Sequence, residues 1–570
     1  MRRAPMGCPL LRSIGSMRLT RILVITAAFA GLAVFSQAQF TGPTPLAWRW
    51  ANPTTVPSYG APVVRGDDVF LAVGNRMFCV DRRNGNTKWK YPQVEAIPAY
   101  FRSGAVLAGD TLVAAADNQL LYAVDAATGA PKWQYSAASP IFGQPVVVAD
   151  AIVFKLSDNT LVAVKSETGE PIWSAPYRVF NGINGGLCGF ETGVIYMTQN
   201  SEIVHLNVPT GRELWRKRFT VVYGDSTPIL YSDTLYVNNG TWVAALNAIT
   251  GTVRWQQNVG EMLAFSPAVS VEGVFVVTRE GKAYVFDTLT GRPKLRTPVV
   301  LGSTPTVQPS AVGKMYLAPL ASGAMVVVNP ADGAIVWSYL IRPLVEGMKA
   351  SASSTTSGGR GGAEAGGAGG GAGGGRGGLS GGAGGLAGGG AGGGTQTEER
   401  IIAVPASGQT VLVGKTLLVP ASDGSLLAFD PELGVDLTGP DVRMVWPTPG
   451  DQVGGTPPLE LIFRIDDLAS GVNSSTLKIT VNDKEMEFDY GRDGFAIVRI
   501  SRFTKNTPLQ DGRKSIKVTV TDWLGNTTVA EYSLTIDNTL PVPVRPGTES
   551  TTTGGTRPGG GGGRGGGGTR

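Results

Sequence analysis

Residues 123–133 read AVDAATGAPKW, and this eleven-residue pattern decides the fold because it recurs along the chain. A small residue opens it, Asp125 follows two positions later, Gly129 stands four positions after Asp125, and Trp133 closes it. Asp or Asn starts a turn by bonding its own backbone, and Gly supplies the positive φ that the turn requires. The other copies place these residue types at Asp81, Gly85 and Trp89, at Gly169 and Trp173, at Asn207, Gly211 and Trp215, at Asn247, Gly251 and Trp255, at Asp287 and Gly291, at Asn329, Gly333 and Trp337, and at Asp430 and Gly434.

The spacing of the repeat predicts an all-β protein. Successive turn glycines lie 40 to 44 residues apart, except for the last pair, which an insertion separates by 101 residues. Apolar alternating runs precede and open each copy, and four short strands in such a unit are typical of a propeller blade. The frequent Gly, Pro and β-branched residues oppose a helical-hairpin repeat. We therefore expect an eight-bladed β-propeller over residues 46–439, in which the repeated Asp/Asn, Gly and Trp residues dock each blade onto its neighbour.

The eighth copy lacks its Trp, and residues 435–438 make a poor outer strand. Residues 46–50, which read LAWRW, precede the first blade without a blade of their own. We expect residues 46–51 to supply the missing outer strand of blade 8, because closing the ring removes the free edges of an open array.

The repeat resembles the tryptophan-docking repeat of the pyrroloquinoline-quinone (PQQ) propellers, the quinoprotein alcohol dehydrogenase-like family. The resemblance implies one of two functions: a dehydrogenase holding quinone and calcium on the propeller axis, or a cofactor-free scaffold similar to the assembly factor BamB. We expect no cofactor and no catalytic residue, because the chain lacks a vicinal Cys pair and blades 1 to 7 carry no insertion that could roof a pocket. Asp225, Glu261 and Arg279 are candidate residues for an enzyme site, and we interpret them as ordinary loop charges.

Residues 443–538 follow a different pattern, in which five apolar runs alternate with period two. This pattern predicts a β-sandwich. Its turns, around Asp466-Asp467 and around Asp522, resemble those of bacterial immunoglobulin-like domains. The Gly-rich insertion at 351–397 and the Gly/Thr/Arg-rich tail at 541–570 are expected to be disordered.

The first 38 residues predict export. Arg18 and Arg21 precede an apolar run at 22–35, and a small-residue site ends at Ala38, which together are typical of a signal peptide. An uncleaved N-terminal anchor is the alternative. Residues 1–38 contain five Arg and no acid, so the rest of the chain balances at 44 basic and 44 acidic residues. This balance argues against nucleic acid as the partner. We expect a periplasmic, secreted or cell-surface protein with no transmembrane segment in the mature chain.

The remaining candidate residues have structural interpretations. The only histidine, His205, and Cys79 both occupy the small-residue slot that opens a copy of the repeat, which predicts burial. Cys188 lies three blades away from Cys79, so we expect no disulfide. The Arg65–Asp67 tripeptide RGD aligns with inter-strand turns of other blades. Asp466, Asp467 and Asp522 are candidate calcium ligands, with turn capping as the alternative, and no other metal site is expected.

These observations favour an exported, non-catalytic binding or scaffold protein of the cell envelope that uses a propeller as its interaction platform. Its expected partners are other envelope or extracellular proteins, or a surface polymer. Two alternatives stay open: a PQQ- and calcium-dependent dehydrogenase, and a surface adhesive or structural protein in which the sandwich does the binding.

Overall fold

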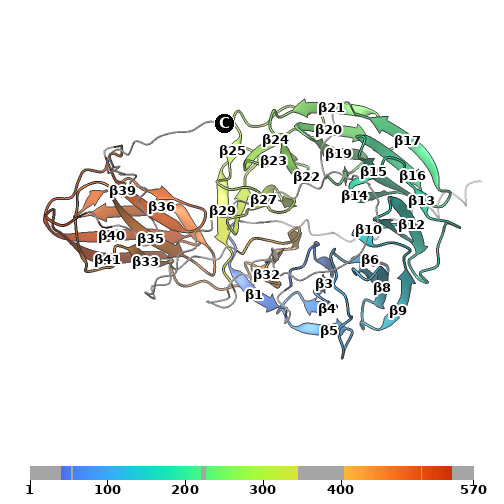
Figure 1. Cartoon of the computed structure of the whole chain (residues 1–570), viewed down its shortest axis with the longest axis horizontal. Coiled ribbons are helices and arrows are strands. Elements are labelled where there is room, and N and C mark those ends of the chain that lie inside the picture. The colour runs from blue at the N-terminus through green and yellow to red at the C-terminus, as the bar shows by residue number, and fades with distance from the viewer. Residues whose placement is uncertain are drawn as a thin grey trace, which may run out of the picture.

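The computed structural model describes residues 40, 42–52, 56–219, 226–343, 404–501, 503–541 and 543, and these residues contain strands but no helix. Eight four-stranded sheets form a ring, and two further sheets lie beside it (Figure 1). The expected all-β fold, an eight-bladed propeller followed by a sandwich, is confirmed. The expected signal peptide, the Gly-rich insertion, almost all of the tail, and Asp225 fall outside the described residues.

The first four blades are antiparallel sheets whose strands follow one another in sequence. Blade 1 contains β2 (Val63–Arg65), β3 (Asp68–Val73), β4 (Arg76–Asp81) and β5 (Thr87–Tyr91). Blade 2 contains β6 (Val106–Ala108), β7 (Thr111–Ala115), β8 (Leu120–Asp125) and β9 (Pro131–Ser136). Blade 3 contains β10 (Ile141–Val148), β11 (Ala151–Leu156), β12 (Thr160–Lys165) and β13 (Tyr177–Arg178). Blade 4 contains β14 (Ile183–Phe190), β15 (Gly193–Thr198), β16 (Glu202–Asn207) and β17 (Arg212–Arg218).

Blades 5 to 7 repeat this arrangement, and blade 8 is assembled from both ends of the propeller sequence. Blade 5 contains β18 (Ile229–Tyr231), β19 (Thr234–Asn239), β20 (Trp242–Asn247) and β21 (Val253–Asn258). Blade 6 contains β22 (Leu263–Ser270), β23 (Gly273–Thr278), β24 (Lys282–Phe286) and β25 (Val299–Val300). Blade 7 contains β26 (Ser310–Val312), β27 (Met315–Pro319), β28 (Ala324–Val328) and β29 (Ile335–Leu340). Blade 8 contains β30 (Val411–Val413), β31 (Thr416–Pro420), β32 (Ser425–Phe429) and β1 (Leu46–Ala51).

The pairing of β1 with β32 closes the ring, as the sequence predicts. The two strands are antiparallel, with Trp50 opposite Leu426 and Trp48 opposite Ala428. The outer strand of blade 8 therefore comes from the N-terminal side of blade 1, and Figure 1 shows β1 beside β32. This pairing leaves the propeller without an open gap between its first and last blades.

The core of the propeller lies between the blades. Eight clusters of buried apolar residues each combine side chains of two adjacent blades. One of them joins blade 8 to blade 1 and contains Trp50, Phe78 and Leu418. Burial of these layers is the main stabilising contribution, because apolar area removed from water is worth about 25 cal/mol per Å².

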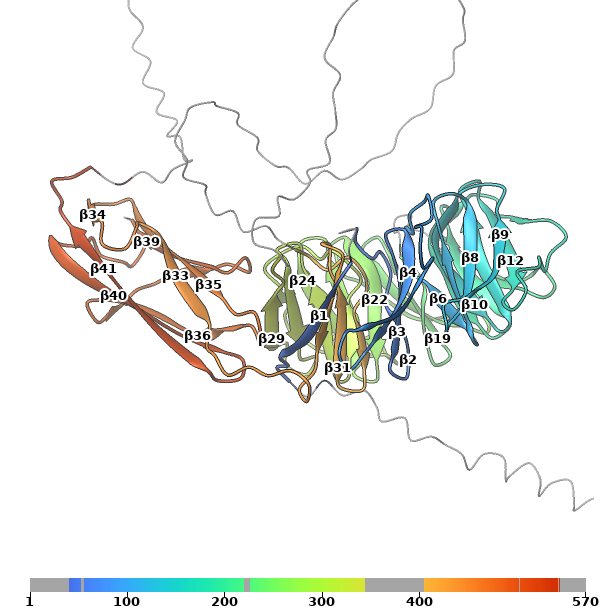
Figure 2. The same ribbon diagram turned by 90° about the horizontal axis from the view of Figure 1, so that it is seen from below.

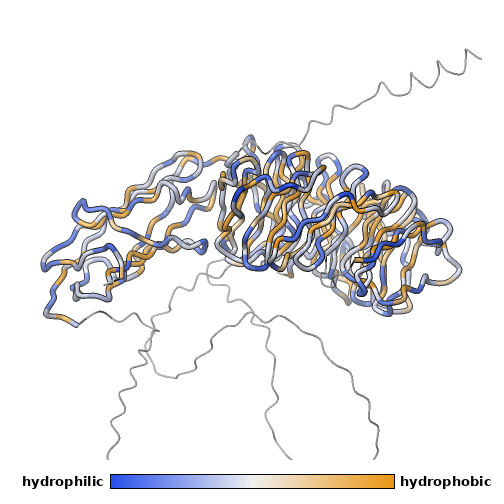
Figure 3. Tube along the Cα trace, turned by 90° about the horizontal axis from the view of Figure 1, so that it is seen from above, coloured by the Kyte–Doolittle hydropathy of each residue, from blue (hydrophilic) through white to orange (hydrophobic). Residues whose placement is uncertain are grey.

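The C-terminal sandwich packs two sheets face to face around one apolar core. One sheet has the order β33 (Asp441–Trp446), β35 (Leu459–Asp466), β39 (Phe495–Ile500) and β38 (Asp489–Tyr490). The other has the order β34 (Gln452–Val453), β41 (Thr527–Ile536), β40 (Gly512–Asp522), β36 (Val472–Val481) and β37 (Lys484–Glu485). Polar and apolar residues alternate along the long strands, as Figure 3 shows. The sandwich lies at the rim of the propeller, next to β29 (Figure 2).

Candidate functional site

The repeated tryptophans lie over the turn glycines of the following blades. A Cβ atom added to Gly129 would come within 2.6 Å of the ring of Trp89, and one added to Gly85 within 2.7 Å of the ring of Trp48. The same close stacking joins Trp133 to Gly169, Trp215 to Gly251 and Trp255 to Gly291. Only glycine leaves room for an indole in this position, so the spacing of the repeat has a direct steric cause.

The indole nitrogens add a hydrogen bond to each of these contacts. Each Nε1 donates to a backbone carbonyl in the turn of the next blade, at 2.6 to 3.1 Å, in the pairs Trp48–Arg82, Trp89–Ala126, Trp133–Ser166, Trp173–Val208, Trp215–Ala248 and Trp255–Thr288. The turn itself is held by the Asp or Asn side chain. Asp125 Oδ1 accepts bonds from the N–H groups of Ala127 and Thr128. Asp81, Asn207, Asn247, Asp287, Asn329 and Asp430 also accept bonds from backbone N–H groups of their turns.

The contact between blades 7 and 8 differs from the six contacts that a Trp docks. Trp337 Nε1 donates to the carbonyl oxygen of Ser470 in the sandwich at 2.8 Å. The turn glycine of blade 8, Gly434, instead lies against Pro45. The loop between β35 and β36 thus occupies the place that the next blade fills elsewhere in the ring.

Further hydrogen bonds fix this loop to the propeller. Tyr339 Oη donates to the Leu468 carbonyl at 2.8 Å, and the Leu46 N–H donates to the Ala469 carbonyl at 2.8 Å. In the opposite direction, Trp523 Nε1 of the sandwich donates to the Ser338 carbonyl at 3.0 Å. Blade 7, β1 and two loops of the sandwich therefore form one continuous junction.

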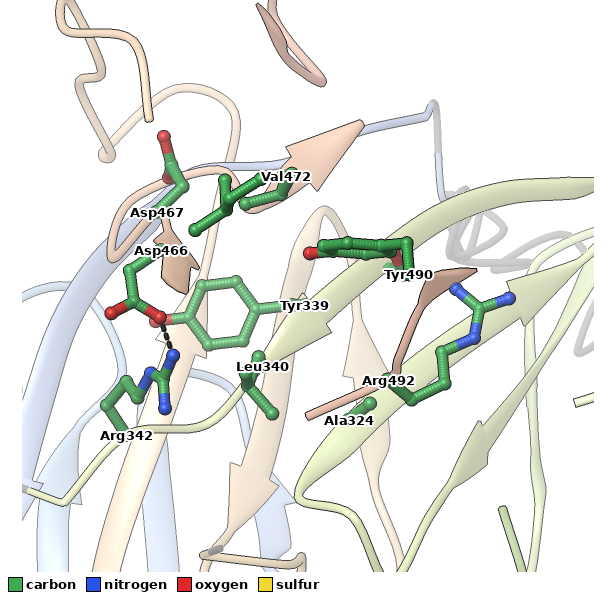
Figure 4. Close-up of a pocket in the computed structure, with 11 residues that line it drawn as sticks. Ala324, Tyr339, Leu340, Arg342, Asp466, Asp467, Val472, Tyr490 and Arg492 are labelled. Carbon is green, nitrogen blue, oxygen red and sulfur yellow. Dashed lines mark ion pairs between the residues drawn. The ribbon is translucent and has the colours of Figure 1, made fainter. Parts of the chain in front are cut away.

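A buried ion pair lies at the same junction. Arg342 forms an ion pair with Asp466, which also accepts a bond from Arg464 Nε at 2.6 Å. Figure 4 shows the Arg342 and Asp466 side chains facing each other beside Tyr339, whereas Asp467 points away. Burial, followed by the charge of Arg464, lowers the pKa of Arg342 to about 10, so the guanidinium remains charged at neutral pH. The adjoining cavity of about 30 Å³ offers room for little more than a water molecule.

The candidate calcium ligands separate in the structure. Asp467 and Asp522 come together with Asp436, a residue that the sequence analysis missed, and their carboxylate oxygens lie within 4.8 Å of one another. Asp466 instead forms ion pairs with Arg342 and Arg464. We call Asp436, Asp467 and Asp522 the acidic triad. Burial, together with the charge of Asp436, raises the pKa of Asp467 above its usual range.

The triad could hold a cation, but most of its oxygens already accept hydrogen bonds. Asp467 Oδ1 accepts the N–H groups of Ala469, Ser470 and Gly471. Asp522 Oδ1 accepts two further N–H groups, and its Oδ2 accepts a bond from Asn526. Calcium requires six to eight oxygens, so turn capping accounts for two of the three carboxylates.

The structure places the isolated candidates away from the junction. His205 is buried beside Phe190 and Trp215, and burial lowers its pKa. Cys79 and Cys188 are free thiols in blades 1 and 4. Burial raises the pKa of Cys79 to about 12 and that of Cys188 to about 11, so neither thiol is activated for nucleophilic attack.

The remaining charged candidates lie in surface turns. Arg65 forms an ion pair with Asp110, and Asp67 forms one with Arg82, so both charged ends of the RGD turn have partners. Glu261 forms an ion pair with Lys282 at 2.5 Å. Arg279 follows β23 at the surface. None of these residues converges with another candidate on a common cavity.

A cavity on the propeller axis permits a test of the quinone hypothesis. The innermost strands of blades 5 to 8 enclose about 360 Å³, with Gln308, Gln409, Ser310 and Thr410 as the polar residues of its lining. Pyrroloquinoline quinone is a tricarboxylate and is accompanied by calcium, so its site needs both cationic side chains and carboxylates. The lining, as the structure describes it, contains no charged residue. These residues do not fit the quinone or its metal.

The closed ring of eight blades, with a Trp docked on the next blade at six of the contacts, defines the chain as a propeller of the PQQ-repeat type. Within this class it is BamB-like: residues 93–181 and 199–356 match the family model described as outer membrane protein assembly factor BamB. BamB from Yersinia pestis is 21% identical over 304 residues, which cover 49% of this chain and 74% of that protein.

Two other similarities are weaker or shorter. Tetrathionate hydrolase from Acidithiobacillus ferrooxidans is 25% identical over 205 residues, and the match spans 31% of this chain but only 40% of the hydrolase. Among solved structures, BamB from Moraxella catarrhalis aligns with a TM-score of 0.47 and 14% identity, covering 68% of this chain and 97% of that one.

Proposed function

We propose that this chain is an exported, non-catalytic scaffold protein of the cell envelope, whose propeller and sandwich together present a rigid surface to other envelope proteins. The observation that carries the proposal is the match of the propeller to the assembly-factor family. A name of that kind describes a protein that works by binding, and a propeller offers a broad face built from variable loops. Fold alone does not assign function, so the residues must also agree.

The geometry of the described residues agrees with binding. The cavity between the innermost strands of blades 5 to 8 has no charged residue in its described lining, the two thiols are not activated, and the lone histidine is buried among aromatic rings. The sandwich is bonded to the propeller through Trp337, Tyr339 and Trp523. A scaffold benefits from such coupling, because a pre-organised surface loses less conformational entropy on binding. No helix in the described part of the chain is long and apolar enough to cross a membrane.

An enzyme is the second candidate, because one of the relatives is a tetrathionate hydrolase. Photo-crosslinking in intact cells separates the two. A photoreactive residue at an exposed position of the propeller rim, such as Leu289 or Val271, is expected to crosslink to envelope proteins in reproducible bands. Absence of crosslinks at every rim position, combined with turnover of tetrathionate by the purified protein, would contradict the proposal.

A further inference from the structure

Four exposed apolar residues lie within two positions of the acidic triad residues in the sequence. Val435 and Leu437 flank Asp436 in the segment after blade 8, Leu468 follows Asp467, and Leu524 lies two residues after Asp522. Their exposed fractions are 72%, 83%, 62% and 45%, respectively. We call these four residues and the triad the junction patch. Soluble proteins rarely leave neighbouring large apolar side chains uncovered, and such patches mark interaction sites.

The three distant segments that carry the patch meet at the triad. The three carboxylates lie within 4.8 Å of one another, and successive Cα atoms are about 3.8 Å apart, so the flanking side chains start close together. Asn526 Nδ2 ties the segments by donating to the Asp436 carbonyl at 3.3 Å and to Asp522 Oδ2 at 2.6 Å. The capped turns at Asp467 and Asp522 hold the two sandwich loops. The surface is therefore pre-organised.

The patch carries negative charge without a counter-charge. Among the described residues, no Lys or Arg forms an ion pair with Asp436, Asp467 or Asp522, in contrast to Asp466 next to them. Asp436 Oδ2 is inaccessible to solvent and accepts no hydrogen bond. A buried carboxylate oxygen without a donor is costly, and a cationic donor from outside would satisfy it.

We propose that the junction patch docks a basic segment of a partner protein, in which a Lys or Arg side chain pairs with the partly exposed Asp436 at the edge of the acidic triad and aliphatic side chains cover Leu437 and Leu468. This inference deepens the proposed scaffold function and rests on it. A metal ion alone would leave the exposed apolar side chains uncovered. An anionic lipid surface would be repelled by the three carboxylates. A basic, aliphatic polypeptide satisfies both the charge and the apolar area.

The experiment measures binding of a short fluorescein-labelled peptide of alternating Leu and Arg to the whole purified protein, by fluorescence anisotropy. Saturable binding is expected, and peptides of alternating Leu and Glu or of alternating Ser and Arg are expected to bind far more weakly. Asp436→Asn keeps the Oδ1 acceptor for the Thr438 N–H but removes the charge, and should weaken binding about tenfold. The double variant Leu437→Ser, Leu468→Ser should have a similar effect.

Matched controls change the same residue types outside the patch. Leu289→Ser removes an exposed leucine of blade 6, and Glu167→Gln removes an exposed carboxylate of blade 3, so both should bind as the parent protein does. Unchanged melting temperatures of all variants show that the surface and not the fold is altered. Equal loss of binding in the patch and control variants would overturn the proposal.

Two other occupants would also overturn it. One is stoichiometric calcium binding that Asp436→Asn abolishes and that excludes the peptide. The other is binding to phosphatidylglycerol vesicles that depends on Leu437 and Leu468. The scaffold function is tested separately by crosslinking at the propeller rim. Crosslinks without peptide binding would contradict only the junction patch, and peptide binding without crosslinks would contradict only the scaffold role.

Discussion

Trp337 of blade 7 donates its indole hydrogen bond to Ser470 of the sandwich, 133 residues further along the chain. Six other tryptophans of the ring, Trp48 among them, donate to the turn of the next blade. The sandwich thus uses the docking position of a blade, which makes it part of the propeller's packing and not a separate attachment. Trp337 is fully buried and packs edge-on against Phe429, so the junction shares the core between blades 7 and 8.

The first prediction concerns this bond. Trp337→Phe keeps an aromatic ring but leaves the buried Ser470 carbonyl without its donor, which should lower the free energy of unfolding by about 1–3 kcal/mol. Trp215→Phe removes the equivalent bond to Ala248 inside the ring and is the control. Only Trp337→Phe should increase cleavage between the propeller and the sandwich in limited proteolysis. Equal cleavage of the two variants would contradict the role of Trp337 at the junction.

The second prediction tests ring closure and blade docking. Gly85 and Gly66 both have positive φ, +74° and +61°, so alanine at either position should cost about 1 kcal/mol or more in backbone strain. Only at Gly85 would the new Cβ also strike the ring of Trp48, adding about 1–3 kcal/mol of overpacking. Chemical denaturation should therefore show Gly85→Ala to be clearly less stable than Gly66→Ala. Equal stabilities would mean that Trp48 of β1 does not pack against Gly85 of blade 1.

The third prediction compares a buried ion pair with an exposed one. Asp466→Asn leaves the buried Arg342 charge without its counter-ion and should cost about 3–5 kcal/mol. Asp489→Asn removes one of the two partners of Arg499 at the surface, leaving Glu460, and should cost about 0–1 kcal/mol. Urea unfolding of both variants measures the difference. A cost for Asp466→Asn no larger than that for Asp489→Asn would show that the pair is not buried in solution.

The fourth prediction concerns pH. Burial lowers the pKa of His205 in the folded protein, so below about pH 6.5 the unfolded chain binds a proton that the folded chain resists. Stability should therefore fall as the pH drops from about 7 to 5, over and above the contribution of the carboxylates. His205→Ala places in this slot the residue that Ala123 and Ala245 supply in other blades. It should flatten the pH dependence in this window, whatever its effect on absolute stability. An unchanged slope would contradict the prediction, because the chain has no other histidine.

Much of the fold could be predicted because local sequence patterns determine it. The turn chemistry around Gly129 and its counterparts repeats at a fixed spacing, and the unpaired LAWRW segment pointed to the outer strand that blade 8 lacks. In blades 3 and 6 the last position of the repeat is Trp173 and Leu295, respectively, but the outer strands β13 and β25 begin after these residues. The repeat did not predict this displacement.

The junction could not be predicted, because it depends on contacts between distant segments. Ser470 and Asp436 sit in loops whose sequences resemble ordinary turns, and only the packing of the sandwich on blade 7 brings them to Trp337 and Asp467. One signal was available. Consecutive residues at the end of a strand point in opposite directions, so Asp466 and Asp467 were poor candidates for a common metal site.

Calorimetric titration of the purified, exported protein with pyrroloquinoline quinone in millimolar calcium tests the central claim most directly. The neutral lining of the axial cavity predicts no heat of binding and no reduction of an artificial electron-acceptor dye when an alcohol or sugar is added. Stoichiometric quinone binding at micromolar affinity, followed by dye reduction, would contradict the scaffold account and identify the protein as a dehydrogenase.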